Sequence, residues 1–279
     1  MRRLAGTLLI AALAVAPIAA DLTIVTVTTI EGAMMAGTPG GVTPKVVVRI
    51  SGTKSRMDVD TGEQVVTTIS DTATSQAYVL RSDDKTATLI PTDAAAPADA
   101  STAALSTVEA MVRPTGQKRD IEGQACDEYM VAMKLPLASL AAAGGSALPP
   151  EAAAMLKDVT LGISGSIWAA KDAPGAAEYA AFQKTTSRLA LAMGRRIPGP
   201  GAAPASIPAG LDRLLTGFPE APGIPYLSEL TTKLEGTGQL VALMQQMGQM
   251  TVTGKVSSIS TETVSTDIFN VPEGYTIVK

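Results

Sequence analysis

Short runs with alternating apolar side chains, each followed by a polar turn, constrain the fold of this chain most strongly. Within one run, Met57 and Val59 alternate with Arg56, Asp58 and Asp60, which is typical of a strand with one exposed face. The pattern predicts an antiparallel meander, in which strands that are neighbours in the sequence are also neighbours in the sheet. The runs of this meander cover 45–51, 54–60, 64–70, 76–81 and 85–90.

Further strands are predicted on both sides of the meander. The run 22–30 is rich in Thr, Val and Ile, which suit a pleated strand. In the stretch 115–134, Gly116 and Gly123 are expected to set turns on either side of a short charged strand, and the whole stretch is expected in the centre of the sheet. The remaining predicted strands are 105–112, 159–170, 224–234 and a last hairpin of 251–259 and 261–269.

One amphipathic helix is predicted over 176–193. Tyr179, Phe182 and Leu189 recur at helical spacing on one face, and Gly194 follows as a C-terminal stop. Such a stripe needs an apolar partner, which the predicted sheet offers. We therefore expect a mainly β (α+β) fold, a curved antiparallel sheet or half-barrel with one or two helices packed on its concave face.

The first 20 residues predict a secretory signal peptide. Arg2 and Arg3 precede an uncharged apolar run that ends at Ala16 and is too short to span a bilayer. Small residues follow, and we expect cleavage after Ala20. No later segment holds about 18 uninterrupted apolar residues, so no transmembrane segment is predicted in the mature chain. We expect a periplasmic or secreted protein with a single domain over 21–279.

Three stretches rich in Ala, Pro and Gly interrupt the strand pattern, at 91–104, 135–158 and 195–222. Their composition predicts irregular insertions rather than strands. If the sheet encloses a cavity, these insertions are candidates to cover or fill its mouth.

Composition excludes several functions. The chain contains no His, which removes the commonest general base, the commonest metal ligand and every Ser-His or Cys-His pair. Without Arg2 and Arg3, 20 of the 22 basic residues remain against 26 acidic residues, a net charge of −6, and no basic cluster is present. These features argue against an enzyme, a cofactor site and a nucleic-acid partner.

The single cysteine, Cys126, cannot form a disulfide within the chain. We interpret it as a small apolar residue on a strand. The alternative is a disulfide between two chains.

Five large side chains are candidates to line an apolar ligand cavity. Trp168, the only tryptophan, lies in a predicted strand, Tyr129 and Met133 share one face of another strand, and Tyr179 and Phe182 belong to the predicted helix. Aromatic and Met side chains offer large apolar surfaces. The alternative interpretation is that they pack the core or dock the helix onto the sheet.

A Met-x-x-Met-x-x-Met run at Met244, Met247 and Met250, together with Met34 and Met35, suggests a minor alternative. Thioethers select Cu(I), which an exported protein could bind. The other interpretation is a flexible apolar patch, because Met adapts to irregular surfaces.

Three motifs of the chain are distinctive. The end of the chain, 269–275, reads Phe-x-Val-Pro-x-Gly-Tyr, and an Ile-Trp strand with a Pro-Gly turn and an aromatic-bearing helix lies at Ile167-Trp168, Pro174-Gly175 and Phe182. The remaining motif, Thr-Gly-x-x-Lys/Arg-x-Ile-x-Gly-x-x-Cys-x-x-Tyr, is formed by Thr115, Gly116, Arg119, Ile121, Gly123, Cys126 and Tyr129. Together these motifs resemble a bacterial family, the domain-of-unknown-function family 4412.

That family is similar to the periplasmic lipoprotein-carrier (LolA-like) half-barrels, in which a sheet wraps around helices and leaves an apolar cavity. The resemblance implies an exported, non-enzymatic protein that binds an apolar or lipid-like ligand. A fold does not fix a function, so the alternative stays open of a cell-envelope structural or protein-interaction module whose interior is filled by its own helix.

Overall fold

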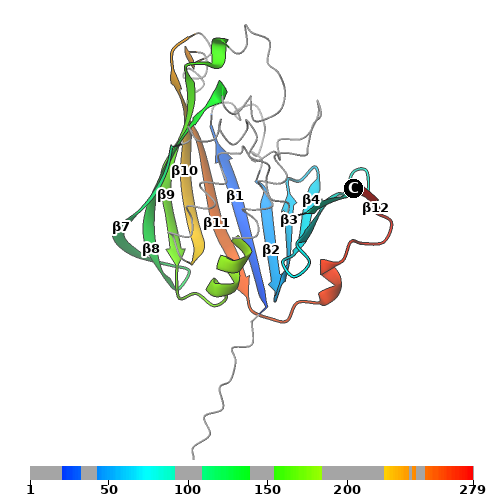
Figure 1. Ribbon diagram of the computed structural model, residues 1–279. Coiled ribbons are helices and arrows are strands. Elements are labelled where there is room, and N and C mark those ends of the chain that lie inside the picture. Colours follow the sequence, from blue (N-terminus) through cyan, green and yellow to red (C-terminus); the bar gives the residue numbers. More distant parts are fainter. Residues whose placement is uncertain are drawn as a thin grey trace, which may run out of the picture.

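The computed structural model describes residues 21–32, 43–91, 109–138, 154–183, 223–238, 241–242 and 249–278. In this part of the chain, one mainly antiparallel sheet dominates (Figure 1). Its strands are β1 (Leu22–Glu31), β2 (Lys45–Ser51), β3 (Lys54–Asp60), β4 (Val65–Asp71), β5 (Gln76–Arg81), β6 (Thr86–Pro91), β7 (Glu109–Ile121), β8 (Gln124–Pro136), β9 (Val159–Ala170), β10 (Ile224–Gly236), β11 (Met250–Ser260) and β12 (Thr276–Val278).

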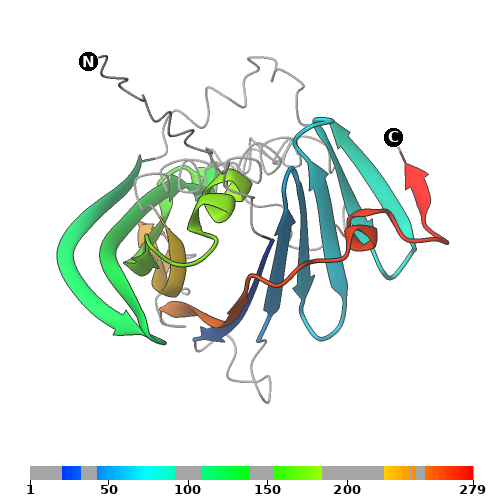
Figure 2. The ribbon, with the colours of Figure 1, turned by 90° about the horizontal axis from the view of Figure 1, so that it is seen from below.

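The strands follow the order β12-β6-β5-β4-β3-β2-β1-β11-β10-β9-β8-β7. Every described ladder is antiparallel except the one between β12 and β6. The sheet curves strongly without closing, so β7 and β12 remain edges (Figure 2). The prediction of a mainly β, curved antiparallel sheet is confirmed, and β2 to β6 form the predicted meander.

The predicted helix begins at 176, and its described part ends at 183. Ala176, Tyr179 and Phe182 pack against the buried cluster that contains Leu22, and the helix lies inside the curve of the sheet (Figure 2). Gly175 makes this approach possible: it has a φ of +81°, and a Cβ atom there would lie 2.5 Å from Leu22 Cδ1. Residues 184–193 of the predicted helix lie outside the described residues.

The stretch 115–134 differs from the prediction in two respects. Gly116 does not end a strand, because β7 runs through it with a bulge between Pro114 and Lys118. The stretch is also not central, because β7 forms an edge of the sheet. The turn expected at Gly123 is confirmed: Glu122 and Gly123 have φ values of 53° and 77°, as a two-residue type I′ hairpin requires.

Two predicted boundaries need correction. The connection expected from 135 begins later, because β8 continues to Pro136 and Leu135 is fully buried opposite Leu161. The hairpin partner expected at 261–269 is wrong, since the segment contains the 3-10 helix η3 (Thr266–Phe269). β11 already pairs with β10 on one side and β1 on the other, so it offers no edge to a further strand.

The segment between β11 and β12, here called the C-terminal strap (261–275), covers one face of the meander. Phe269 is buried against Ile69, Leu80 and Ala87. Ala77 and Val79 alternate with Leu80 along β5 and belong to a separate buried cluster, on the opposite face. Both faces of these short strands are therefore buried.

Candidate functional site

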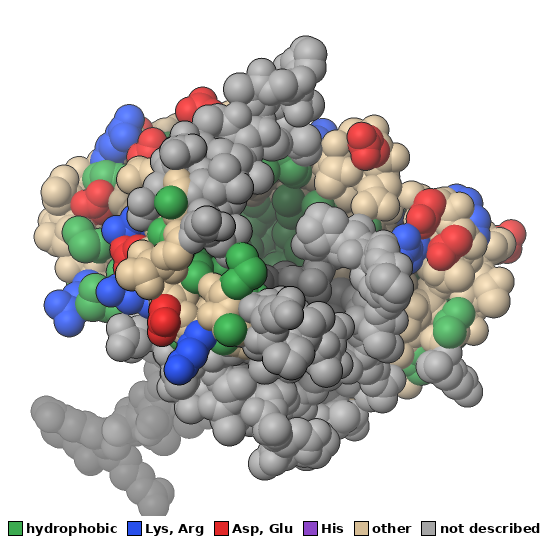
Figure 3. Space-filling view, turned by 90° about the horizontal axis from the view of Figure 1, so that it is seen from above, with side chains coloured by type: hydrophobic (Ala, Val, Ile, Leu, Met, Phe, Trp, Pro, Cys, Tyr) green, Lys and Arg blue, Asp and Glu red, His purple; other side chains and the backbone are tan. Residues whose placement is uncertain are grey.

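The molecular surface has a hollow on the open side of the curved sheet. Seen from above, hydrophobic side chains form the visible floor of this hollow (Figure 3). Of the insertions predicted at 91–104, 135–158 and 195–222, residues 92–104, 139–153 and 195–222 lie outside the described residues, so their relation to the hollow stays a prediction. Pro91 belongs to β6 instead.

The register of β8 and β9 places two of the candidate ligand residues on opposite faces of the sheet. Trp168 pairs with Glu128, whereas Tyr129 pairs with Ile167. Because successive side chains of a strand point to opposite faces, Trp168 and Tyr129 cannot line the same surface of β8 and β9.

Trp168, Tyr179 and Phe182 share one buried cluster. Trp168 belongs to it with an exposed fraction of 8%, and the two helix residues pack against it, with their ring centroids 6.0 Å apart. The guanidinium carbon of Arg119 lies 5.9 Å from the Trp168 ring centroid. Burial raises the pKa of the Tyr179 phenol to about 12. This group of side chains docks the helix and partly covers Trp168.

Tyr129 and Met133 belong to a second cluster with Val131 and Leu135, and both are nearly fully buried. The ammonium of Lys171 lies 6.0 Å from the Tyr129 ring centroid and forms an ion pair with Asp127 at 2.7 Å. The structure thus divides the five predicted residues into two clusters and does not bring all five together.

A pocket that the sequence did not indicate lies where β10 and β11 separate. These strands pair only from Leu227 and Lys255 to Thr232 and Met250, although β10 continues to Ile224 along β9 and β11 continues to Ser260 along β1. Bulges interrupt both outer ladders next to this point. Because bulges bend a strand and increase its twist, the sheet forks here.

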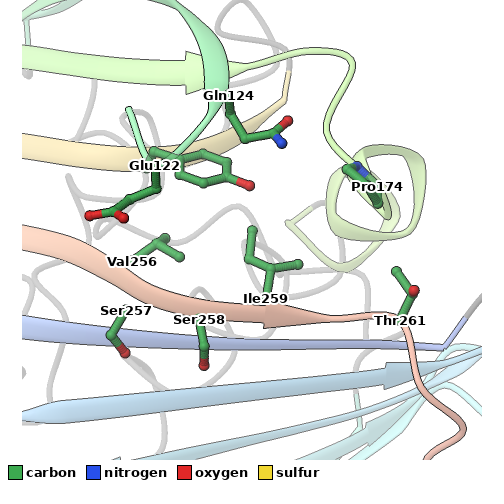
Figure 4. Close-up of a pocket in the computed structure, with 9 residues that line it drawn as sticks. Glu122, Gln124, Pro174, Val256, Ser257, Ser258, Ile259 and Thr261 are labelled. Carbon is green, nitrogen blue, oxygen red and sulfur yellow. The ribbon is translucent and has the colours of Figure 1, made fainter. Parts of the chain in front are cut away.

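The fork borders an open pocket of about 290 Å³, and Glu122 and Gln124 of the β7–β8 hairpin lie on its other side (Figure 4). None of the five candidate ligand residues is among the described residues that line it. No local pattern could have predicted the pocket, because it depends on where two strands distant in sequence stop pairing. Its lining residues are Glu122, Gln124, Pro174, Tyr226, Val256, Ser257, Ser258, Ile259 and Thr261.

One ion pair joins β11 to the β7–β8 hairpin beside the pocket. Lys255 of β11 lies 2.8 Å from the Glu122 carboxylate of the hairpin tip. The hydrogen bond from Lys255 and its positive charge lower the pKa of Glu122, so this carboxylate is ionised at neutral pH. Burial raises the pKa of the nearby Tyr226 phenol, and Cys126 adds to this rise.

Cys126 is buried, and the structure gives it the surroundings of a core residue. Burial, with smaller contributions from Asp120 and Asp127, raises the pKa of its thiol. The thiol is therefore protonated at neutral pH, and a thiol is a far weaker nucleophile than a thiolate.

Among the described residues, no group of three or more His, Cys, Asp or Glu side chains is placed to hold a metal ion. Met250 lies in β11, whereas Met244 and Met247 of the predicted copper run, like Met34 and Met35, fall outside the described residues. Within the same described part, no helix is long and apolar enough to cross a membrane.

Comparisons with known proteins assign no family to the chain. No protein-family model matches it, and no curated protein is significantly similar to it. The resemblance to family 4412 therefore rests on the short motifs alone.

Proposed function

We propose that the mature chain is an exported, non-enzymatic protein that binds an apolar or lipid-like ligand in the hollow of its curved sheet. The observation that carries this proposal is the hydrophobic floor of the hollow (Figure 3). Apolar side chains across the floor of a hollow suit an apolar ligand, because ligand pockets are lined predominantly by hydrophobic and aromatic groups.

The expected chemistry is burial rather than catalysis. Removing apolar surface from water contributes about 25 cal/mol per Å² to the binding free energy, so burial alone can hold an acyl chain. The lack of His anywhere in the chain agrees with such a role, because His is the commonest general base.

The start of the folded sheet supports export with cleavage after Ala20. Leu22 is completely buried, and the Asp21 carboxylate accepts a hydrogen bond of 2.7 Å from the Val264 main-chain N–H. Residues that directly follow the predicted cleavage site thus belong to the folded unit. Intact mass and N-terminal sequencing of the exported protein test this point, and a mature chain that begins after Leu22 would contradict it.

The single tryptophan permits a direct test of ligand binding. The full mature chain is titrated with cis-parinaric acid, whose absorption overlaps Trp168 emission. We expect saturable energy transfer from Trp168, and competition by unlabelled fatty acid. Native mass spectrometry of protein purified from its own envelope should then reveal a co-purified apolar molecule. A clean ligand-free mass together with absent energy transfer would refute the proposal.

A second candidate function is a cell-envelope interaction module with a filled interior. The burial of Trp168, which is 8% exposed in the cluster against which the helix packs, favours it. In that case cis-parinaric acid gives no saturable transfer, and in-cell crosslinking of the exported protein gives one discrete, reproducible adduct. Failure of both experiments would exclude both candidates.

A further inference from the structure

The pocket in the fork has two chemically different walls. In Figure 4, Val256 and Ile259 extend from β11 towards the side on which Glu122 and Gln124 lie, whereas Ser257 and Ser258 extend to the other side of the strand. The Ser257 hydroxyl donates a hydrogen bond to the Val25 carbonyl, 3.2 Å away. A ligand in this pocket would therefore meet an apolar surface on one side and a carboxylate and an amide on the other.

The charges at the pocket select against anions. Glu122 is the single charged side chain among the described lining residues, and it is already paired with Lys255. The amide of Gln124 and the hydroxyl of Thr261 each donate and accept hydrogen bonds. Because Lys255 is already committed to Glu122, an anion would find no unpaired cation among the described lining residues, whereas a neutral hydroxyl-bearing molecule can satisfy the amide and the hydroxyl.

The volume of the pocket selects a small ligand. A volume of about 290 Å³ is at the lower limit of ligand pockets, which span about 300 to 1,000 Å³. One water molecule occupies about 30 Å³ in the liquid, so the pocket has room for one substituted six-membered ring.

The backbone at Glu122 gives independent support. A two-residue type I′ turn needs φ above zero at both positions and favours Asn or Asp before Gly. Here Glu122 occupies the first position with a φ of 53°, and a long side chain in this conformation costs about 1 kcal/mol. The turn tolerates this strain while it places the carboxylate at the pocket and within reach of Lys255.

From these observations we propose that the fork between β10 and β11 is a second binding site, which takes a small uncharged molecule with several hydrogen-bonding groups and one apolar face, such as a pyranoside. None of the five candidate ligand residues is among the described residues that line this pocket, so this proposal does not depend on the lipid-binding proposal. Binding of cis-parinaric acid and binding at the fork should be independent of each other.

The test uses two probes of the same ring shape. The 15N-labelled mature chain is titrated by NMR with methyl β-D-glucopyranoside and with D-glucuronate at neutral pH. We expect saturable shifts of the amides of Glu122, Gln124, Val256 and Ile259 with the neutral sugar, and binding about tenfold weaker for the anion, because the anion has to compete with Glu122 for the Lys255 ammonium. Equal binding of both sugars, or the absence of saturable shifts at these amides, would overturn the proposal.

Two matched variants locate the site. Gln124→Leu removes the amide at nearly constant size and should weaken binding about fivefold. Gln76→Leu is the control. Gln76 also begins a strand, but neither it nor any other residue of β5 is among the described residues that line the pocket. Equal loss in both variants would contradict the assignment. If Gln124→Leu does not fold, judged by its NMR spectrum, Thr261→Val takes its place with the same expected weakening.

Discussion

The two halves of the sheet are built in different ways. The meander half, β2 to β6, consists of strands of six or seven residues joined by short hairpin turns. The long-strand half, β7 to β11, has strands of 11 to 13 residues, and only its first hairpin has a two-residue turn. The meander half is held by local turns and covered by the strap, whereas the long-strand half depends on the register between distant segments.

The largest expected effect is in the long-strand half, at Gly165 of β9. A Cβ atom there would overlap the Glu229 carbonyl oxygen and lie 2.9 Å from Leu230 Cα, both main-chain atoms of β10. Because main-chain atoms in a ladder cannot move aside independently, Gly165→Ala should lower the free energy of unfolding by at least about 3 kcal/mol. Urea unfolding followed by circular dichroism measures this.

Gly162→Ala is the matched control for Gly165. It lies in the same strand, but a Cβ atom there would be no closer than 3.5 Å to its nearest neighbour, the flexible Lys233 side chain. The free energy of unfolding should change by less than about 1 kcal/mol. If both variants are equally destabilised, close approach of β9 and β10 is not the reason that β9 contains glycine.

In the meander half, the largest effect is expected at the strap. Phe269 is 6% exposed and packs against Ile69, Leu80 and Ala87. Phe269→Ala should lower the free energy of unfolding by about 3 kcal/mol through lost burial and a cavity, measured by urea unfolding. Phe269→Leu retains most of the apolar volume and should lose clearly less. Equal losses would mean that strap docking does not depend on filling this site.

A half-buried carboxylate, Asp58 of β3, links three neighbouring strands of the meander half, β2, β3 and β4. The Asp58 carboxylate accepts hydrogen bonds from Arg49 at 2.7 Å, from Arg56 at 2.9 Å and from the Thr67 hydroxyl at 2.6 Å. Arg56 also donates to the Ile268 carbonyl of the strap, 3.0 Å away. Asp58→Asn should therefore lower the free energy of unfolding by about 2 kcal/mol at pH 7, measured by urea unfolding.

The Asp58 variant also predicts a pH dependence. Burial raises the pKa of Asp58, but hydrogen bonds from Arg56 and Thr67 and the charges of Arg56 and Arg49 outweigh burial and lower it. A lowered pKa contributes stability that is present above the unfolded pKa of about 3.9 and is lost as pH falls through the folded pKa. The difference between wild type and Asp58→Asn should shrink below about pH 4. A constant difference down to pH 2 would show that the charge is not responsible. Asp83→Asn is the control: the Asp83 carboxylate also pairs with Arg81, but the pair is exposed to solvent, so the free energy of unfolding should change clearly less than in Asp58→Asn.

The same contrast explains what the sequence could predict. Alternation of Met57 and Val59 and the polar turns specify the meander locally, so β2 to β6 were predicted almost residue by residue. The strap is not predicted, because the residue pattern at 261–269 is typical of a strand. A strand there could not pair with β11, because β1 and β10 already occupy both edges of β11. The candidate residues Trp168 and Tyr129 were predicted as one set, but the β8–β9 register, which the sequence does not encode locally, separates them.

The smallest effect is expected at the edge strand β12. All three of its residues are exposed, and it pairs with only Thr86, Ala87 and Thr88 of β6, through bonds such as Thr276 N–H to the Lys85 carbonyl at 2.9 Å. Truncation after Tyr275 should therefore cost about 1 kcal/mol or less of unfolding free energy, measured by urea unfolding. Because the truncation leaves the edge of β6 without a partner strand, light scattering should show more association at high concentration than for the single-site control Ile277→Thr. A loss as large as that of Phe269→Ala would mean that the strap is held by β12 rather than by its buried aromatic side chain, and the division of the meander half into a docked strap and a weak edge would be wrong.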